Sequence, residues 1–243
     1  MIVAIDGPAG TGKGTIAGLI SKRLGYTYID TGAMYRCITL KMLNEGIAID
    51  ADISVIQDLL QRTKIEFINI NDKQRVFLDD EDVTEEIRTP KVNELVSPVS
   101  AIKEIRIKLV DMQRELGKAS NVVMEGRDIT TVVFPDAEVK IYLTADADER
   151  ANRRYKELIE KGIETTYEET YESIRKRDEN DMKKEMGALK VAEGAVVIDS
   201  TKMSIEEVYE KVVELIINTE LDGTTDDEEI TVNGSNDDAL EEN

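Results

Sequence analysis

The sequence of 243 residues contains no histidine, no tryptophan and only one cysteine, Cys37. Without histidine there can be no Ser-His-Asp triad, no histidine-ligated metal and no phosphohistidine intermediate. A single cysteine permits neither an intrachain disulfide nor a multi-cysteine zinc site, as is typical of proteins in a reducing compartment. We expect Cys37 to pack in the core rather than to act in redox chemistry.

Long apolar runs are also missing. No segment approaches the roughly 18 apolar residues of a membrane-spanning helix, and the N-terminus enters a strand-like segment without a signal-peptide core. Acidic residues outnumber basic ones by 51 to 31, and ten acidic residues but no basic one lie in 220–243. This acidity argues against nucleic-acid and membrane partners. We therefore predict a cytoplasmic monomer with a disordered acidic tail over 220–243.

Short apolar, β-branched segments alternate with helical patterns along the chain. The helical stripes lie at 16–24 and 205–216, where apolar residues recur at helical spacing. Strand–helix alternation predicts an α/β fold with a parallel sheet of five buried strands flanked by helices. The predicted strands are 2–6, 26–30, 122–125, 139–143 and 196–199.

Two segments interrupt this alternation. Residues 64–70 and 74–78 alternate as paired strands around a turn at 71–73, inside the long stretch between the second and third predicted strands. Residues 148–190 are charged and helical, and we expect them to be mobile. We therefore predict one domain over 1–219, in which an insertion over about 37–120 and a helical lid over about 148–190 interrupt a core of 1–36, 121–147 and 191–219.

A glycine-rich motif lies between the first predicted strand and the first predicted helix. It reads Gly7-Pro8-Ala9-Gly10-Thr11-Gly12-Lys13-Gly14-Thr15. Its glycines let successive N–H groups point at phosphate oxygens, and Lys13 can reach the β- and γ-phosphates at the helix N-terminus. A Ser or Thr usually follows this lysine and binds Mg²⁺, whereas Gly14 follows here. The motif predicts a P-loop NTPase-type fold that binds ATP, and we assign no protein ligand to a metal.

Two further motifs follow the second and third predicted strands. In Asp30-Thr31-Gly32-Ala33-Met34-Tyr35-Arg36, Thr31 can cap the next helix and Arg36 can grip a phosphate in two places. Taken alone, this segment also fits a capped helix with a solvated arginine. Glu125-Gly126-Arg127-Asp128 lies at the strand end where open parallel sheets bind ligands. A structural ion pair is the alternative there.

Together these motifs resemble bacterial cytidylate kinase. Residues 81–90, 131–136 and Arg177-Asp178 with Asp181 are also similar to that family, and the resemblance runs from about residue 1 to 217. The P-loop is shared by many kinases, whereas the remaining motifs in this order are far more specific. The resemblance implies transfer of the γ-phosphoryl group of ATP to CMP or dCMP, with Mg²⁺, in pyrimidine nucleotide metabolism. It also identifies the insertion as the subdomain that binds the nucleoside monophosphate.

By motif position, the resemblance implies roles for individual residues. It places ATP on Gly7 to Thr15, the acceptor phosphate on Arg36 and Arg127, and Thr31 and Tyr35 close to the acceptor nucleotide. Ser97, Arg106 and Asp128 match positions that read cytosine. Arg177 and Asp181 match positions near the acceptor ribose and phosphates, and Lys184 stands where the family usually has arginine. We predict a catalytic set of Lys13, Arg36, Arg127, Arg153 and Arg177, in which Arg153 is a basic lid residue that can close over the phosphates.

Some points stay open in the sequence. Ser97 and Arg106 also fit solvated polar residues on a helix, and Arg153 also fits the exposed face of a lid helix; for Arg150 and Arg154 we choose neither interpretation. Another nucleoside monophosphate kinase, acting on AMP or UMP, is the alternative enzyme. A P-loop protein that only binds nucleotide is the alternative class, although the Ser/Thr and the guanine-reading motif of such switches are absent.

Overall fold

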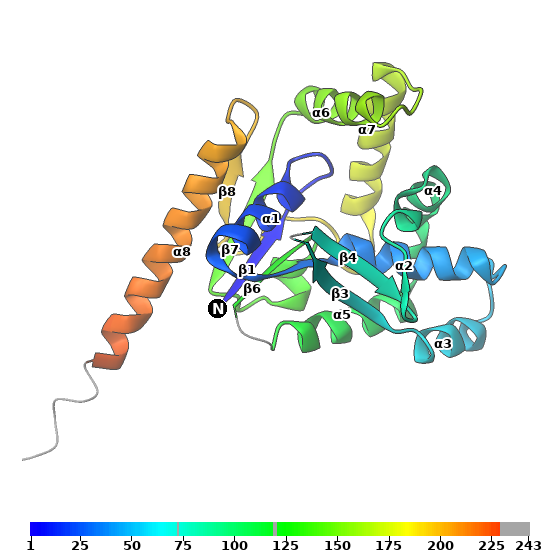
Figure 1. Ribbon diagram of the computed structural model, residues 1–243, viewed down its shortest axis with the longest axis horizontal. Coiled ribbons are helices and arrows are strands. Elements are labelled where there is room, and N and C mark those ends of the chain that lie inside the picture. The colour runs from blue at the N-terminus through cyan, green and yellow to red at the C-terminus, as the bar shows by residue number, and fades with distance from the viewer. Residues whose placement is uncertain (72, 119–120, 229–243) are drawn as a thin grey trace, which may run out of the picture.

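The computed structural model describes residues 1–71, 73–118 and 121–228, of which 222–228 are described by backbone alone. A five-stranded parallel sheet forms the centre, and β1 lies in its middle (Figure 1). This confirms the predicted fold class, with strand limits that differ from the predicted ones by one residue at most. The order is β2 (Thr27–Asp30), β6 (Val122–Gly126), β1 (Ile2–Asp6), β7 (Val139–Thr144) and β8 (Val196–Asp199).

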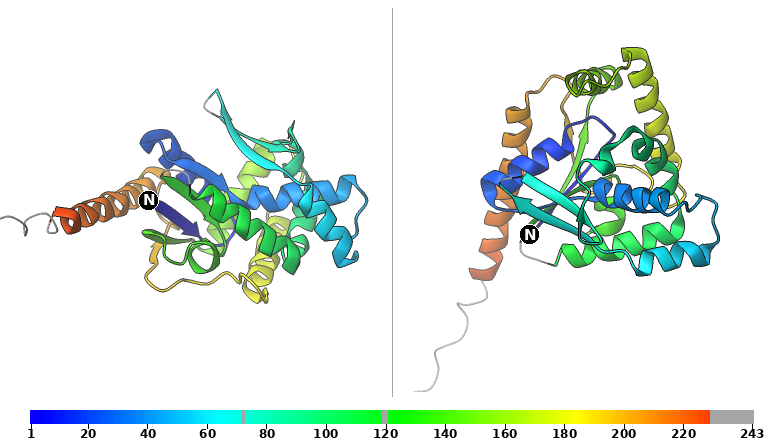
Figure 2. Two further views of the ribbon diagram at one scale, coloured as in Figure 1. Left: turned by 90° about the horizontal axis from the view of Figure 1, so that it is seen from below. Right: turned by 45° about the vertical axis from the view of Figure 1, so that its right-hand side comes forward.

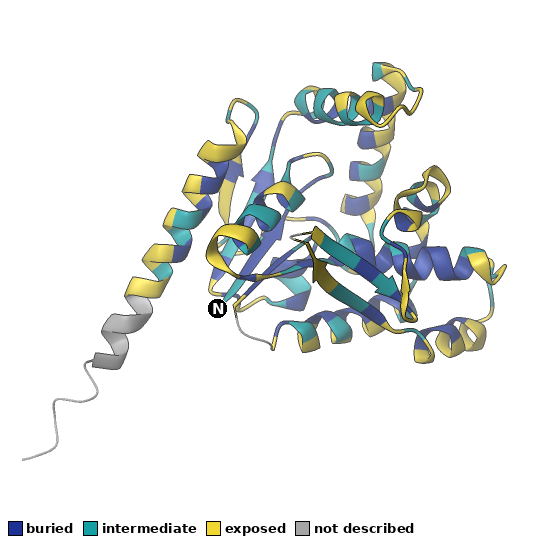
Figure 3. Ribbon diagram, viewed as in Figure 1, coloured by how far each residue is buried: buried dark blue, intermediate teal, exposed yellow. Residues whose placement is uncertain are grey.

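The central strand is buried on both faces because helices cover both sides of the sheet. Successive side chains of a strand point to opposite faces, so Val3 and Ile5 join one core while Ala4 joins the other. The first core is completed by α1 (Lys13–Leu24) and α8 (Ile205–Glu228). The second core is completed mainly by α2 (Thr31–Asn44), which is buried along most of its length, and α5 (Lys103–Leu116) (Figure 3).

The end of α8 departs from the prediction. Val208, Val212 and Ile216 form the predicted buried stripe, but the helix continues to Glu228 and includes the first residues assigned to a disordered tail. Each residue added to a formed helix gains one hydrogen bond without a new nucleus, so a long helix extends past its packed stripe. Residues 229–243, the rest of the predicted tail, lie outside the described residues.

The insertion between β2 and β6 contains the predicted hairpin. Strands β3 (Ile65–Ile70) and β4 (Lys73–Leu78) pair antiparallel, and β4 begins at the last residue of the predicted turn. A short third strand, β5 (Glu81–Asp82), completes this smaller sheet. The helical elements around it are α3 (Ile53–Gln61), η1 (Glu86–Arg88) and α4 (Pro90–Val99).

The charged segment after β7 forms two helices, α6 (Ala147–Glu160) and α7 (Tyr167–Lys183), as predicted. They pack on each other and stand at the same end of the molecule as the loop before α1 and as α4 (Figure 2). A π-helical turn, η2 (Ile129–Val133), follows β6. In the described part of the chain, no helix is both long and apolar enough to cross a bilayer. The limits predicted for insertion and lid stay a prediction.

Candidate active site

The glycine-rich loop connects β1 to α1, and its shape requires glycine at two points. Gly7 has φ 150°, and a Cβ atom there would lie 2.0 Å from the carbonyl oxygen of Leu143 on β7. Gly12, the N-cap of α1, has φ 92°, a left-handed conformation that side chains disfavour. The loop therefore presents Lys13 as the first residue of α1, where the helix dipole favours anions.

Lys13 is enclosed by its own loop. Its ammonium nitrogen donates to the carbonyl oxygen of Pro8 at 2.7 Å and to Thr11 Oγ1 at 3.4 Å, and the residue is 4% exposed. Burial, and then the positive charge of Arg127, lower the pKa of Lys13 to about 7. An anion bound in the loop would favour the charged form again.

The start of α2 corrects the predicted cap. Asp30, not Thr31, is the N-cap: its Oδ1 accepts from the Ala33 N–H at 2.9 Å. The helix begins at Thr31 itself, so Asp30 holds the extended conformation that an N-cap needs. Thr31 instead donates from its hydroxyl to the Glu125 carbonyl at 2.8 Å, which fixes α2 to the end of β6. Arg36 lies on the first turns of α2, 3.9 Å from Asp30, and its buried Nε has no partner.

Three positive side chains converge near Asp181 of α7. Arg127 Nε and Lys184 Nζ each lie 2.8 Å from one of its carboxylate oxygens. Burial alone would raise the pKa of Asp181, but Arg127 and Lys184 outweigh it and lower the pKa to about 2. Arg177 makes no hydrogen bond or ion pair to any described residue, and burial together with the charge of Arg127 lowers its pKa to about 9. This basic cluster, Arg127, Arg177 and Lys184, favours an anionic ligand.

A second charged pair is buried where α5 meets the end of β6. Arg106 and Asp128 are 2% and 5% exposed, and the Arg106 guanidinium donates to Asp128 and, at 3.2 Å, to the Ser100 carbonyl. The guanidinium carbon lies 5.7 Å from the centre of the Tyr35 ring. Burial raises the pKa of Asp128 to about 6 against the effect of Arg106. Ser97 is half-buried on the neighbouring α4.

The lid arginines are placed differently from one another. Arg153 donates to Glu149 Oε1 at 2.8 Å and to the Ser200 carbonyl at 2.7 Å, so the structure does not bring it to the basic cluster. Arg154 is paired with Glu157 on the same helix. Arg150 contacts the glycine-rich loop itself, donating to the Ala9 carbonyl at 3.1 Å. The catalytic role assigned to Arg153 stays a prediction.

Two acidic residues that the sequence did not assign to the site organise it. Asp178 accepts from the Ala9 N–H at 3.4 Å and from Arg150 at 2.5 Å, so the lid holds both polar groups of Ala9. Asp6, at the end of β1, accepts from the Ile129 and Thr130 N–H groups at 2.9 and 2.7 Å. The sequence features that could have identified them are the Arg-Asp pair at 177–178 for Asp178, and for Asp6 its position directly before the glycine-rich loop.

Glu125 is a further acidic side chain beside the glycine-rich loop. It accepts from the Tyr28 hydroxyl at 2.9 Å, and a Cβ on Gly14 would lie 2.9 Å from its Oε1. Burial and the neighbouring Asp30 raise its pKa. Within the described ranges, no three carboxylate or cysteine side chains converge as a metal-binding group. A loop without such a group fits Mg²⁺ that is held largely by phosphate oxygens and water.

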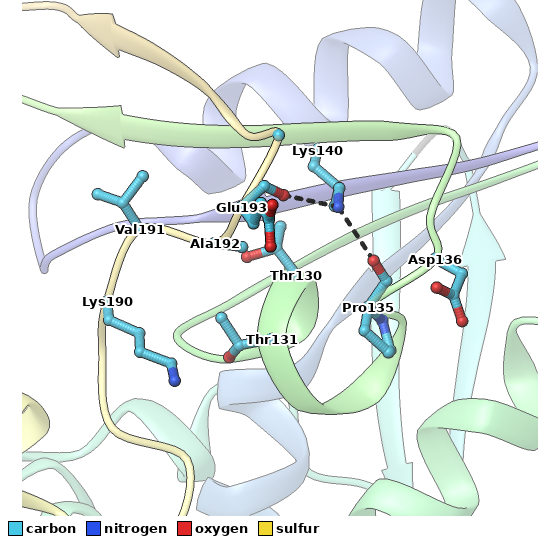
Figure 4. A pocket seen from close by; sticks show the side chains of 10 residues that line it. Thr130, Thr131, Pro135, Asp136, Lys140, Lys190, Val191, Ala192 and Glu193 are labelled. Atoms are coloured by element: carbon cyan, nitrogen blue, oxygen red, sulfur yellow. Dashed lines mark hydrogen bonds between the residues drawn. The ribbon is translucent and has the colours of Figure 1, made fainter.

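A cavity of about 550 Å³ lies outside this site (Figure 4). It lies between Thr130 and Thr131 of η2 and the segment 190–194. Lys140 crosses it and donates to the carbonyl oxygens of Pro135 at 3.1 Å and Glu193 at 2.8 Å. None of the residues assigned to nucleotide binding lines this cavity.

Comparison with known proteins gives a consistent result. A family model described as cytidylate kinase matches residues 3–218. The cytidylate kinase of Caldicellulosiruptor saccharolyticus is 54% identical over 88% of this chain and 94% of its own length. The cytidylate kinase of Carboxydothermus hydrogenoformans is 49% identical over 89% of this chain and 97% of its own length. The cytidylate kinase of Bacillus subtilis is 45% identical over 88% of this chain and 95% of its own length.

Among solved structures, shikimate kinase from Acinetobacter baumannii in complex with shikimate has a TM-score of 0.46 at 15% identity, covering 90% of this chain and 94% of that one. The family match ends at residue 218. The last turns of α8 and the acidic residues that follow therefore lie outside the matched region.

Proposed function

The chain belongs to the cytidylate kinase family, and on that premise we propose how its own residues transfer the γ-phosphoryl group of ATP to CMP and dCMP. The family match confirms the resemblance found in the sequence. The observation that carries the proposal is the joint presence of a phosphate-binding loop around Lys13, a basic cluster at Asp181 and the buried Arg106–Asp128 pair. These groups match the two phosphate chains and the base of the reacting nucleotides.

The reaction needs no histidine and no general base. The nucleophile is a phosphate oxygen of the acceptor, which is already anionic at neutral pH, so catalysis consists of aligning and neutralising two charged phosphates. In our proposal Lys13 holds the β- and γ-phosphates, while Arg36, Arg127 and Arg177 hold the acceptor phosphate. Arg153 contacts phosphate only if it leaves Glu149 and Ser200. Lid movement would separate it from Ser200, whereas Glu149 is on the same helix and is left only by a change of side-chain rotamer.

The Arg106–Asp128 pair accounts for base selection. Cytosine presents an amino donor at N4, which Asp128 accepts, and acceptors at N3 and O2, which suit Arg106 and Ser97. Uracil has a carbonyl at the corresponding position and would meet Asp128 acceptor to acceptor. We assign Thr31 and Tyr35, both near the start of α2, to positions beside the acceptor nucleotide. Asp181 holds Arg127 and Lys184 in place and lies near the ribose.

Mg²⁺ accompanies ATP and supplies positive charge to its phosphates. Its ligands would be phosphate oxygens and water, with Glu125 as the protein carboxylate beside the loop. The insertion as the monophosphate-binding subdomain and the lid over 148–190 belong to the same proposal. A monomeric state, the absence of a nucleic-acid partner and a cytoplasmic location stay predictions.

The direct test is ADP release from Mg-ATP, measured in parallel with CMP, dCMP, UMP, AMP and GMP. We expect activity with CMP and dCMP well above that with the other three. Activity on AMP or UMP instead would keep the kinase and reject the base assignment. Silence on all five would leave a nucleotide-binding protein. Lys13→Ala serves as the matched control, since it should abolish transfer and leave the circular dichroism spectrum unchanged.

A further inference from the structure

A small group of buried polar atoms near the Arg106–Asp128 pair lacks hydrogen-bond partners. Among the described residues, the buried side-chain atoms without a partner are Tyr35 Oη, Arg36 Nε, Arg106 Nε and Gln113 Nε2. Buried polar atoms are nearly always hydrogen-bonded, and leaving one unpaired is unfavourable. Three of the four belong to two helices that pack on each other, Tyr35 on α2 and Arg106 and Gln113 on α5.

The fold places these three side chains together. Arg106 and Gln113 are seven residues apart on α5 and therefore occupy the same face of the helix, two turns from each other. This face packs against α2, which carries Tyr35, and against η2, which directly follows Asp128. The Arg106 guanidinium lies over the Tyr35 ring, so contacts run from α5 through α2 to Asp128.

Gln113 stands at the far end of this series of contacts. Burial raises the pKa of the Tyr35 hydroxyl, while Arg106 and then Gln113 act in the opposite direction, which places the Gln113 amide beside that hydroxyl. No hydrogen bond of normal geometry joins the two groups. Small shifts of Tyr35 or Gln113 would form one and would move the ring that supports Arg106.

Folding alone does not explain a glutamine at this position. Gln113 is 1% exposed, and Leu109, about one turn before it on the buried face of α5, is apolar and fully buried. A leucine at 113 would fill similar space without a buried unpaired amide, so the amide is a cost to stability. A glutamine that packing does not require at this position calls for a role other than packing.

We propose that Gln113 is a positioning residue for cytosine recognition. Its amide orients the Tyr35 hydroxyl, the Tyr35 ring holds the Arg106 guanidinium, and Arg106 with Asp128 reads the base. Gln113 itself does not contact the nucleotide. This inference rests on the proposed function, and it predicts an effect on base selection rather than on phosphoryl transfer.

The test compares Gln113→Leu with Lys108→Leu, a leucine substitution at an exposed position of the same helix. For both variants and the wild type, kcat/KM is measured with CMP and with UMP, together with KM for ATP and the melting temperature. We expect Gln113→Leu to lower kcat/KM for CMP by roughly tenfold, the effect of about one net hydrogen bond. UMP, already mismatched at Asp128, should lose less, so the CMP/UMP ratio falls while Tm and KM for ATP stay the same or Tm rises.

A CMP/UMP ratio unchanged in Gln113→Leu, with the wild type active on CMP, would overturn the inference and leave the proposed function intact. A wild type inactive on CMP would overturn the proposed function itself. If Gln113→Leu does not fold, Tyr35→Phe tests the same contact, because it removes only the hydroxyl and should lower the ratio similarly. Where both fold, the double variant should show no further loss, and additive losses would contradict the proposed coupling.

Discussion

Binding of Mg-ATP should take up close to one proton at pH 8. Lys13 is buried within its own loop, and its pKa is lowered to about 7. One pH unit above that pKa, about nine tenths of the lysines are neutral. Bound phosphates restore the charged form, because the β- and γ-phosphates place negative charge at the ammonium group. We therefore expect uptake of about half a proton per ATP at pH 7 and about nine tenths at pH 8.

The measurement is isothermal titration calorimetry at each pH, in two buffers that differ in ionisation enthalpy. The difference in observed enthalpy divided by the difference in ionisation enthalpy gives the number of protons. Other charged groups act on Lys13 as well: Arg127 and Arg177 lower its pKa, while Glu125 and Asp6 raise it. Lys13→Arg separates Lys13 from them, since its guanidinium stays charged at both pH values. Uptake near zero in the wild type, or equal uptake in Lys13→Arg, would refute this reasoning.

The buried charged pairs lead to four further predictions. Asp128→Ala should lower kcat/KM for CMP at least about tenfold and reduce the ratio of kcat/KM for CMP to that for UMP, because cytosine N4 loses its acceptor. In the wild type, kcat/KM for CMP should fall as the pH drops below about 6, where Asp128 becomes protonated. Arg106→Leu leaves Asp128 buried without its partner and should lower the free energy of unfolding, measured with urea at pH 8, by about 3–5 kcal/mol. A loss no larger than that of an ordinary surface substitution would contradict the pairing. Asp181, with a pKa of about 2 against 3.8 when unfolded, contributes about 2–3 kcal/mol that is lost as pH falls from 4 towards 2, so acid unfolding of Asp181→Asn should lack this component.

The elements themselves could be read from local patterns. The glycine-rich motif predicted a strand, a tight loop and a helix, because glycine is needed wherever φ is positive or a backbone approaches closely, as at Gly7 and Gly12. The hairpin over 65–78 followed from its two-residue periodicity. The cap of α2 was misplaced by one residue, since Asp30 and Thr31 are both good N-caps and only the helix start distinguishes them.

The sequence by itself determined the phosphate loop, the alternation of strands and helices and, through its motifs, the family to which the chain belongs. Only the tertiary structure decided which side chains act together. Asp178 reaches Ala9, and Asp6 holds the turn after Asp128, across more than 100 residues of chain in each case. Gln113 is identified as a positioning residue only by its burial beside Tyr35. Periodicity and propensity act between near neighbours, whereas contacts between distant segments depend on how the helices pack on the sheet, and no local pattern encodes that packing.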